Sequence, residues 1–212
     1  MNYLAHIYLS GESDEIILGN FIGDFVKGNK FRKYPEQVAL GIQLHRSIDS
    51  FTDQHVDVKE FSQILKPGYG RYSGIVADIF MDHFLAANWH HYSTDTLRQC
   101  AKHAHAIFLS NFLMLPLRVK QILPFLIQHK RFESYAKREN LFQILEIMSN
   151  RTSLPSNSEW AIQILNQEYD KFEQLFHRFF AEMIEHVKTE HGIQILTPET
   201  NTVSLSYRAG ID

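Results

Sequence analysis

Apolar residues recur at helical spacing along nearly the whole chain, whereas the alternating pattern of a half-buried strand is almost absent. In residues 17–26, for example, apolar side chains lie three or four positions apart, which gathers them on one face of a helix. No internal repeat or low-complexity linker divides the 212 residues, and a chain of this length can bury one substantial core. The sequence therefore predicts an all-α protein folded as a single-domain helical bundle.

Proline and glycine set the expected ends of the first helices. Gly28 fits the C-terminal end of the helix that contains residues 17–26, and Pro35 fits the first turn of the next one. Residues 66–72 contain one proline and two glycines, which predicts a loop between helices.

Similar signals continue in the second half of the chain. Ser93 or Thr94 is expected to cap the start of a helix. Pro116 and Pro124 are expected to divide residues 114–132 into two short helices, because proline removes a helical hydrogen bond.

The last predicted helix is long. Ser156 and Glu159 have the spacing of a capping box, and the stretch from Trp160 to His191 contains neither proline nor glycine. The helical pattern is lost afterwards, so residues 193–212 are expected to be extended or poorly ordered. The predicted organisation is a helical domain over residues 1–192 followed by this tail.

Composition excludes several classes of protein. The formal net charge is −3, so bulk charge does not favour binding to nucleic acid. No window approaches the roughly 18–20 uninterrupted apolar residues of a membrane span, and the first residues lack the basic start of a signal peptide. Cys100 is the only cysteine, so no intrachain disulfide can form. We therefore expect a cytoplasmic protein with no membrane contact.

Four groups of chemically active residues lie within the first 91 positions. They are His6; Asp24; His45 with Asp49 and Asp53; and Asp78 with Asp82 and His83. A polar stripe at four-residue spacing is commonly a solvated helix face, and a lone Asp is commonly a cap or a surface residue. The alternative is a site, because Asp78 and Asp82 lie in a largely apolar helix, where carboxylates are costly unless they are paired or bind a metal.

Mixed Asp and His ligands without Cys favour Mn²⁺, Fe²⁺, Mg²⁺ or Zn²⁺. Such an ion can activate water and withdraw charge from a phosphoryl oxygen. The basic residues Lys27, Arg46 and Arg71 lie near these acids in the sequence, and an Arg fork can hold two phosphate oxygens. Each could equally be an ordinary surface charge.

The stretches "MNYLAHIYLS", "GNFIGDFVKG", "GIQLHRSIDSFTD" and "RYSGIVADIFMDHFLAANW", in this order and spacing, closely resemble the acyl carrier protein phosphodiesterase family. The resemblance covers residues 1–90, with weaker motifs beyond. It implies a divergent HD-domain-like helical fold. It also implies a hydrolase in which a divalent-metal-activated water cleaves the phosphodiester between 4′-phosphopantetheine and the serine of holo-acyl carrier protein. The expected ion is Mn²⁺, with Mg²⁺ or Fe²⁺ as alternatives.

The resemblance also suggests roles for individual residues. The implied metal ligands are Asp24, His45, Asp78, Asp82 and His83, with His6 and Asp49 orienting them. Asp24, His83, Arg46 and Arg71 are the expected catalytic residues, the two arginines facing the phosphodiester. The order Asp82-His83 reverses the His-Asp pair of ordinary HD hydrolases.

Carrier proteins are strongly acidic, so the enzyme needs a basic docking surface. Lys27, Lys30, Arg32 and Lys33 fall within seven residues and are the candidate surface, although a solvated turn would have the same composition. Two other functions remain open at this point. One is a metal-dependent phosphohydrolase acting on a nucleotide or other small phosphodiester, and the other is a non-catalytic helical binding protein.

Overall fold

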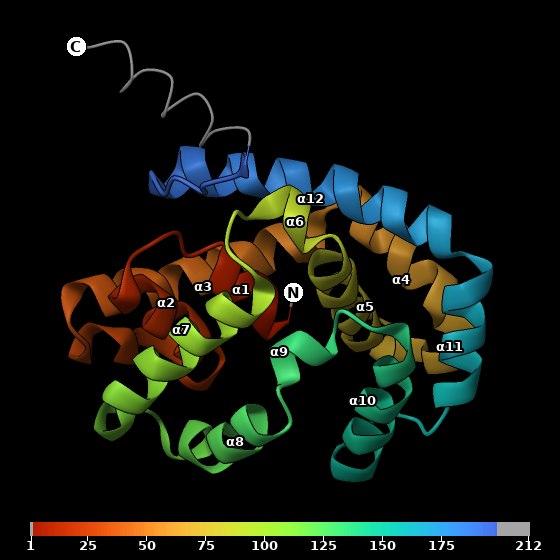
Figure 1. The fold of residues 1–212 in the computed structure, drawn as a ribbon, viewed down its shortest axis with the longest axis horizontal. Helices are drawn as coiled ribbons and strands as arrows, with labels where there is room; N and C mark the ends of the chain where they lie inside the picture. The colour runs from red at the N-terminus through yellow and green to blue at the C-terminus, as the bar shows by residue number, and fades with distance from the viewer. Residues whose placement is uncertain (1, 199–212) are drawn as a thin grey trace.

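The computed structural model describes residues 2–198, and this part of the chain is entirely α-helical and 3-10 helical apart from short connections (Figure 1). The all-α, single-domain prediction is confirmed, while the HD-like relationship stays a prediction. In chain order the elements are α1 (Tyr3–Tyr8), α2 (Asp14–Ile22), η1 (Gly23–Phe25), η2 (Gly28–Lys33), α3 (Glu36–Gln54), α4 (Val56–Tyr69), η3 (Gly70–Tyr72), α5 (Ser73–Ala87), α6 (Trp89–Tyr92), α7 (Leu97–Ser110), η4 (Phe112–Met114), α8 (Leu117–Gln128), α9 (Arg131–Ser134), α10 (Arg138–Arg151), α11 (Ser158–Gln167) and α12 (Tyr169–His191).

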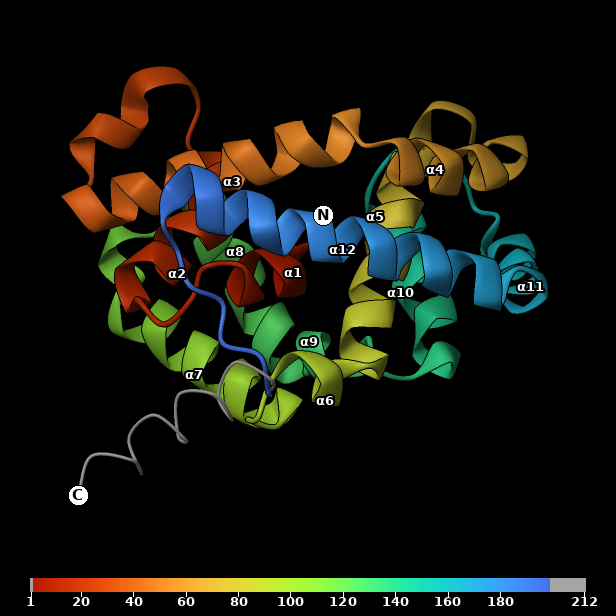
Figure 2. The ribbon, with the colours of Figure 1, turned by 90° about the horizontal axis from the view of Figure 1, so that it is seen from above.

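The two longest helices frame the molecule. Seen from above, α12 runs alongside α3 and then over α4, so one layer of the bundle is formed by these three helices (Figure 2). The short helix α1 and the apolar helix α5 lie in the middle, beneath that layer (Figure 1). Eleven of the fifteen residues of α5 are buried, which explains its nearly continuous apolar sequence.

Helices α2 and α3 approach each other at two glycines. A Cβ atom on Gly19 would lie 2.1 Å from the carbonyl oxygen of Val38, and one on Gly41 would lie 2.3 Å from that of Ile16. Only residues without side chains allow the two backbones to come this close. This crossing holds α2 against α3, and η1, which follows α2 directly, also contacts α3.

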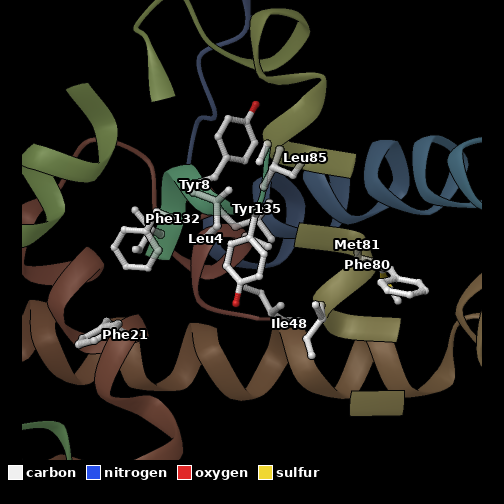
Figure 3. Close-up of a cluster of buried hydrophobic side chains, with 14 of the residues drawn as sticks. Leu4, Tyr8, Phe21, Ile48, Phe80, Met81, Leu85, Phe132 and Tyr135 are labelled. Atoms are coloured by element: carbon white, nitrogen blue, oxygen red, sulfur yellow. The ribbon is translucent and has the colours of Figure 1, made fainter. Parts of the chain in front are cut away.

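Aromatic and aliphatic side chains from distant segments fill the core. Figure 3 shows Leu4 and Tyr8 of α1 next to Tyr135, with Phe132 and Phe21 on one side and Phe80 and Met81 of α5 on the other. The rings of Phe21 and Phe108 stack at 3.8 Å and join α2 to α7. The core thus anchors α1, a six-residue helix too short to be stable alone.

Several predicted helix ends are wrong in detail. Helix α2 ends at Ile22 rather than Gly28, and two 3-10 helices follow it. The predicted loop over residues 66–72 is mostly helical, because α4 continues to Tyr69. Gly68 packs against the ring of Trp160, and its carbonyl accepts a hydrogen bond from Asn157, so tertiary contacts hold this helix end.

The remaining differences concern caps and prolines. Thr96, not Ser93 or Thr94, caps α7, since Thr96 and Gln99 form a reciprocal capping box. Pro116 precedes α8, as expected for a helix start, but Pro124 lies inside α8 and does not divide it.

The long final helix is interrupted. It is split at Glu168 into α11 and α12, and α11 begins after Asn157 without the Ser156 capping box. Residues 192–197 have no regular secondary structure, and Ile195 is buried against the helices. The rest of the predicted tail, residues 199–212, lies outside the described residues.

Candidate metal centre

The site is built around His6, which α1 places in the interior with its orientation fixed by Asn20 of α2. Nδ1 of His6 lies 2.8 Å from Oδ1 of Asn20. The amide nitrogen of Asn20 already donates to the His6 carbonyl and to Ser10 Oγ, so its oxygen accepts. His6 therefore carries its proton on Nδ1 and presents the lone pair of Nε2.

His45 occupies the middle of α3, and its ring stacks on that of His6 with centroids 4.1 Å apart. Room for this ring exists because residue 23 is glycine: a Cβ there would lie 2.3 Å from Cγ of His45. The close approach of α2 and α3 therefore matters for the site, because α2 is followed directly by η1, whose Gly23 lies against the His45 ring.

Two carboxylates complete the cluster. Nε2 of His45 lies 3.3 Å from Oδ1 of Asp24 and 3.2 Å from Oδ2 of Asp49, four residues further along α3. The other oxygen of Asp49 lies 3.3 Å from Nε2 of His6. One acidic side chain thus bridges both imidazoles, and a second one approaches His45 from η1.

Burial and charge give the two histidines opposite properties. Burial lowers the pKa of His6 to about 4, although Asp49 opposes this, so its imidazole is neutral at pH 7. Burial also disfavours charge on His45, but Asp24 and Asp49 outweigh it and raise the pKa to about 9. The imidazoles in turn hold the pKa of Asp49 below its usual range despite burial, and His45 lowers that of Asp24.

The donor set fits a divalent ion. His6, His45 and Asp49 each offer one ligand atom, and all three atoms lie within 4.8 Å of one another. Nε2 of His6 and Nε2 of His45 are buried, and neither makes a hydrogen bond of good geometry within the described structure. Two ligands at about 2.1 Å from one ion and roughly 90–110° apart are about 3.0–3.4 Å apart, which matches the nitrogen–oxygen distances found here.

Two hollows with different walls adjoin this cluster. One, of about 140 Å³, is lined by Tyr3, Ile75, Asp78 and Met148 among others. The other, of about 150 Å³, lies against residues 26–28. Both are lined in part by Asp24 and His45, so both border the proposed ligands.

The family model of acyl carrier protein phosphodiesterases matches residues 1–183. The chain belongs to this family. It is 32% identical over 191 residues to the acyl carrier protein phosphodiesterase of Pectobacterium atrosepticum, covering 90% of this chain and 99% of the relative. The enzyme of that name from Yersinia pestis is 32% identical over 185 residues, covering 87% and 96%. No solved structure matches the chain.

Of the metal ligands expected from the phosphodiesterase family, the structure brings Asp24 and His45 together and places Asp78 in the wall of the same hollow. Burial raises the pKa of Asp78, and the charges of Asp49 and Asp53 add to this. Asp53 itself is exposed on α3.

Asp82 and His83 make other contacts. The carboxylate of Asp82 accepts hydrogen bonds from the backbone N–H groups of Leu4 and Ala5, at 3.0 and 3.2 Å, and so holds the first turn of α1. Nδ1 of His83 lies 2.7 Å from the carbonyl oxygen of Tyr135, and its Nε2 lies 3.1 Å from the hydroxyl of Tyr169. Both side chains are buried and already use the atoms that would bind a metal.

The basic residues that lie near the acids in the sequence make different contacts in the structure. Arg46 donates from Nη2 to the carbonyls of Val26 and Gly28, at 2.8 and 2.7 Å, so it fastens the segment that follows Asp24. Lys27 lines the hollow there. Arg71 lies on η3, is exposed and donates to the hydroxyl of Tyr72.

The sequence reasoning missed Asn20, Gly23 and Tyr3. Asn20 sets the tautomer of His6, Gly23 makes room for His45, and Tyr3 lines the hollow. A signal for Asn20 was present, because it is a polar residue in an apolar helix four positions before Asp24.

No helix of the described chain is long and apolar enough to span a membrane.

Proposed function

We propose that this protein hydrolyses the phosphodiester between 4′-phosphopantetheine and the serine of holo-acyl carrier protein, releasing apo-acyl carrier protein and free phosphopantetheine. The observation that carries the proposal is the convergence of His6, His45 and Asp49 at one point, in a chain of the acyl carrier protein phosphodiesterase family. The relatives from Pectobacterium atrosepticum and Yersinia pestis are named for that activity, and this chain matches them over nearly their whole length.

The ligands proposed for the divalent ion are His6, His45, Asp49 and Asp24, with Asp78 in the wall of the same hollow. The proposed ion is Mn²⁺, as the family resemblance implies, with Mg²⁺ or Fe²⁺ as alternatives; mixed imidazole and carboxylate ligands can bind a divalent ion of this kind. Asp82 and His83 are left out of the set, since their polar atoms already make hydrogen bonds elsewhere. This replaces His83 by His6 as the second imidazole.

A divalent ion held by these residues would acidify a bound water and withdraw charge from a phosphoryl oxygen. The protein side chains contribute order and charge. Asn20 keeps the lone pair of His6 directed at the centre, and Asp49 bridges the two imidazoles. Arg46 holds the segment over residues 26–28 in place and so keeps Lys27 at the hollow, where its ammonium can attract a phosphate group.

The exposed residues Lys30, Arg32 and Lys33 of η2 continue from Lys27 away from the centre. We propose that they attract the acidic carrier protein toward the hollow beside residues 26–28. Residues 1–192 would act as the catalytic domain, and the protein would work in the cytoplasm, where carrier-protein substrates and reduced Cys100 are expected.

The experiment is direct. The protein is incubated with holo-acyl carrier protein and Mn²⁺, Mg²⁺ or Fe²⁺, and the carrier is analysed by mass spectrometry for loss of the phosphopantetheine arm. An unchanged carrier mass with every metal would refute the proposal. Faster hydrolysis of a small phosphodiester than of the carrier protein would instead favour a general phosphohydrolase.

A further inference from the structure

Exposed apolar side chains gather in one short segment of the molecule. Among the described residues, Leu109, Phe112, Leu113, Met114 and Leu117 are large, hydrophobic and 37–91% exposed, although they lie within nine positions. They come from the end of α7, from η4 and from the start of α8. We call this segment, residues 109–117, the apolar tip. Half of the large exposed hydrophobics of the described chain are here, and such concentrations mark interaction sites.

The apolar tip lies within a segment that has no acidic residue. Residues 96–132 contain six of the 21 Lys and Arg residues and none of the 24 Asp and Glu residues. This segment therefore carries a formal charge of +6, and the remainder of the chain carries −9. Arg98, Lys102, Arg118 and Lys130 are exposed, Lys120 is half-buried and Arg131 is buried. Such separation of charge along a chain of net −3 makes this segment locally basic.

The tip is held in a defined conformation. Lys120 donates from Nζ to the carbonyl of Leu113, and its ammonium lies 5.4 Å from the centroid of the Phe112 ring. Asn111 donates from Nδ2 to the carbonyl of Ile107 and closes α7. A preordered apolar surface loses little conformational entropy when a partner covers it.

The apolar tip also lies at the same end of the molecule as η2, which carries Lys30, Arg32 and Lys33. In both ribbon views α7 and α8 are at the same end as α2 and the start of α3, between which η2 runs (Figures 1 and 2). Helix α2 is joined to α7 through the Phe21–Phe108 stack, and Phe21 also lines the hollow at the metal centre.

We propose that the apolar tip and the basic surface around it form the docking surface for the acidic carrier-protein substrate. This proposal rests on the proposed function. It adds an apolar contact surface for the carrier protein to the basic residues of η2. Protein interfaces combine an apolar centre with a polar rim, and opposite charge on the partner speeds encounter. A basic cluster that binds lipid carries about 4–8 Lys or Arg in a short segment. The six Lys and Arg residues of the segment are instead spread from Arg98 to Arg131, and Arg131 is buried, which favours a protein partner over a membrane.

Two variants test the surface, each with a matched control. Leu113→Ser/Leu117→Ser removes apolar contact where little packing is lost, since these side chains are 91% and 72% exposed. Its control is Val56→Ser on α4, which is 71% exposed. Arg118→Glu reverses a charge, and Lys66→Glu, exposed at the other end of the molecule on α4, is its control.

Binding of fluorescently labelled apo-carrier protein is measured by anisotropy, together with KM and kcat for the holo-carrier. Kd and KM should rise about tenfold in the tip variants at unchanged kcat and melting temperature, and less than about twofold in the controls. Arg118→Glu should also weaken the salt dependence of binding. Kd values of the tip variants equal to that of the unsubstituted protein would overturn the proposal. It would also be overturned if the tip variants lost binding to anionic phosphatidylserine vesicles while their binding to the carrier protein stayed the same. Failure of the unsubstituted protein to cleave the holo-carrier would refute the proposed function alone, because Kd for the apo-carrier is measured separately.

Discussion

The rings of His6 and His45 stack 4.1 Å apart, and their Nε2 atoms lie 3.3 and 3.2 Å from opposite oxygens of Asp49. Two stacked imidazoles this close cannot both carry charge without mutual repulsion. The protein resolves this by burying His6, whose pKa falls to about 4, and by surrounding His45 with Asp24 and Asp49, which raise its pKa to about 9. At pH 7, His6 is therefore neutral and offers a nitrogen ligand, while His45 carries a proton that a bound cation would displace.

Replacing Asp24 with Ala should abolish hydrolysis of the carrier protein and leave the fold intact. The change removes a proposed ligand whose side chain is 59% exposed, so the free energy of unfolding should change by about 0.5 kcal/mol or less. Activity by mass spectrometry and stability by circular dichroism check this. Asp53→Ala, an exposed carboxylate on α3, is the control and should stay active. Unfolding of the Asp24 variant would contradict its assignment as a ligand.

Asn20→Leu should weaken metal binding by about 10–100-fold, since Asn20 fixes the tautomer of His6 through Nδ1. The measurement is a titration of Mn²⁺ followed by the rise in melting temperature. Asn20→Asp keeps an acceptor oxygen opposite Nδ1 and should bind metal more tightly than the Leu variant. Equal affinities in the two variants would remove this role for Asn20.

Gly23→Ala should impair activity without a change in charge. A Cβ at this position would lie 2.3 Å from Cγ of His45, so the imidazole or η1 must move. The matched control is Gly74→Ala on α5, where a Cβ meets nothing within 4 Å and alanine favours the helix by about 0.5–1 kcal/mol. Enzyme assays and thermal melts of both variants provide the comparison. Full activity of Gly23→Ala would show that the site tolerates a shifted ring.

Asp82 should make the protein less stable as pH rises from about 4 to about 7. Burial raises its pKa to about 7, although the N–H groups of Leu4 and Ala5 favour the charged form. The folded state then binds the proton more tightly than the unfolded state, so stability is greatest below the unfolded pKa of about 3.9 and is lost up to the folded one. The loss amounts to about 4 kcal/mol at most. In Asp82→Asn this dependence should vanish, as measured by urea unfolding across this pH range. Parallel curves for both proteins would exclude Asp82 as the cause.

Charge reversal at Lys30, Arg32 and Lys33 should raise KM for the carrier protein by about tenfold and weaken its dependence on salt. These side chains are exposed on η2, so kcat and melting temperature should stay the same. Steady-state kinetics at low and high salt test the prediction, with Lys66→Glu as the control. Unchanged KM would confine docking to other surfaces.

The sequence predicted the helical fold, and it singled out the residues that the structure brings together at the candidate centre: His6, Asp24, His45 and Asp49. Helical periodicity survives in a single chain, and the i, i+4 spacing of His45 and Asp49 is a local property that α3 preserves. Asp24 could be recognised because it interrupts an apolar pattern. The family resemblance placed the activity, and the family match confirms that assignment.

What the sequence could not predict depends on contacts between distant segments. The orientation of His6 depends on Asn20, which fixes its ring, and the carboxylate of Asp82 instead accepts hydrogen bonds from the N–H groups of Leu4 and Ala5. Arg46 was expected at the phosphate, but the carbonyls of Val26 and Gly28 lie within its reach. The final helix also looks continuous in sequence, because neither proline nor glycine marks the break at Glu168.

The two hollows that share Asp24 and His45 have a consequence for the order of events at phosphorus. Phosphoryl transfer places the attacking and departing oxygens roughly in line, on opposite sides of the phosphorus atom. The walls of the two hollows differ, with Tyr3, Ile75 and Met148 in one and residues 26–28 in the other, so a carrier protein bound at one would leave the other for water. Substrate docking and solvent access then need not compete for a single hollow.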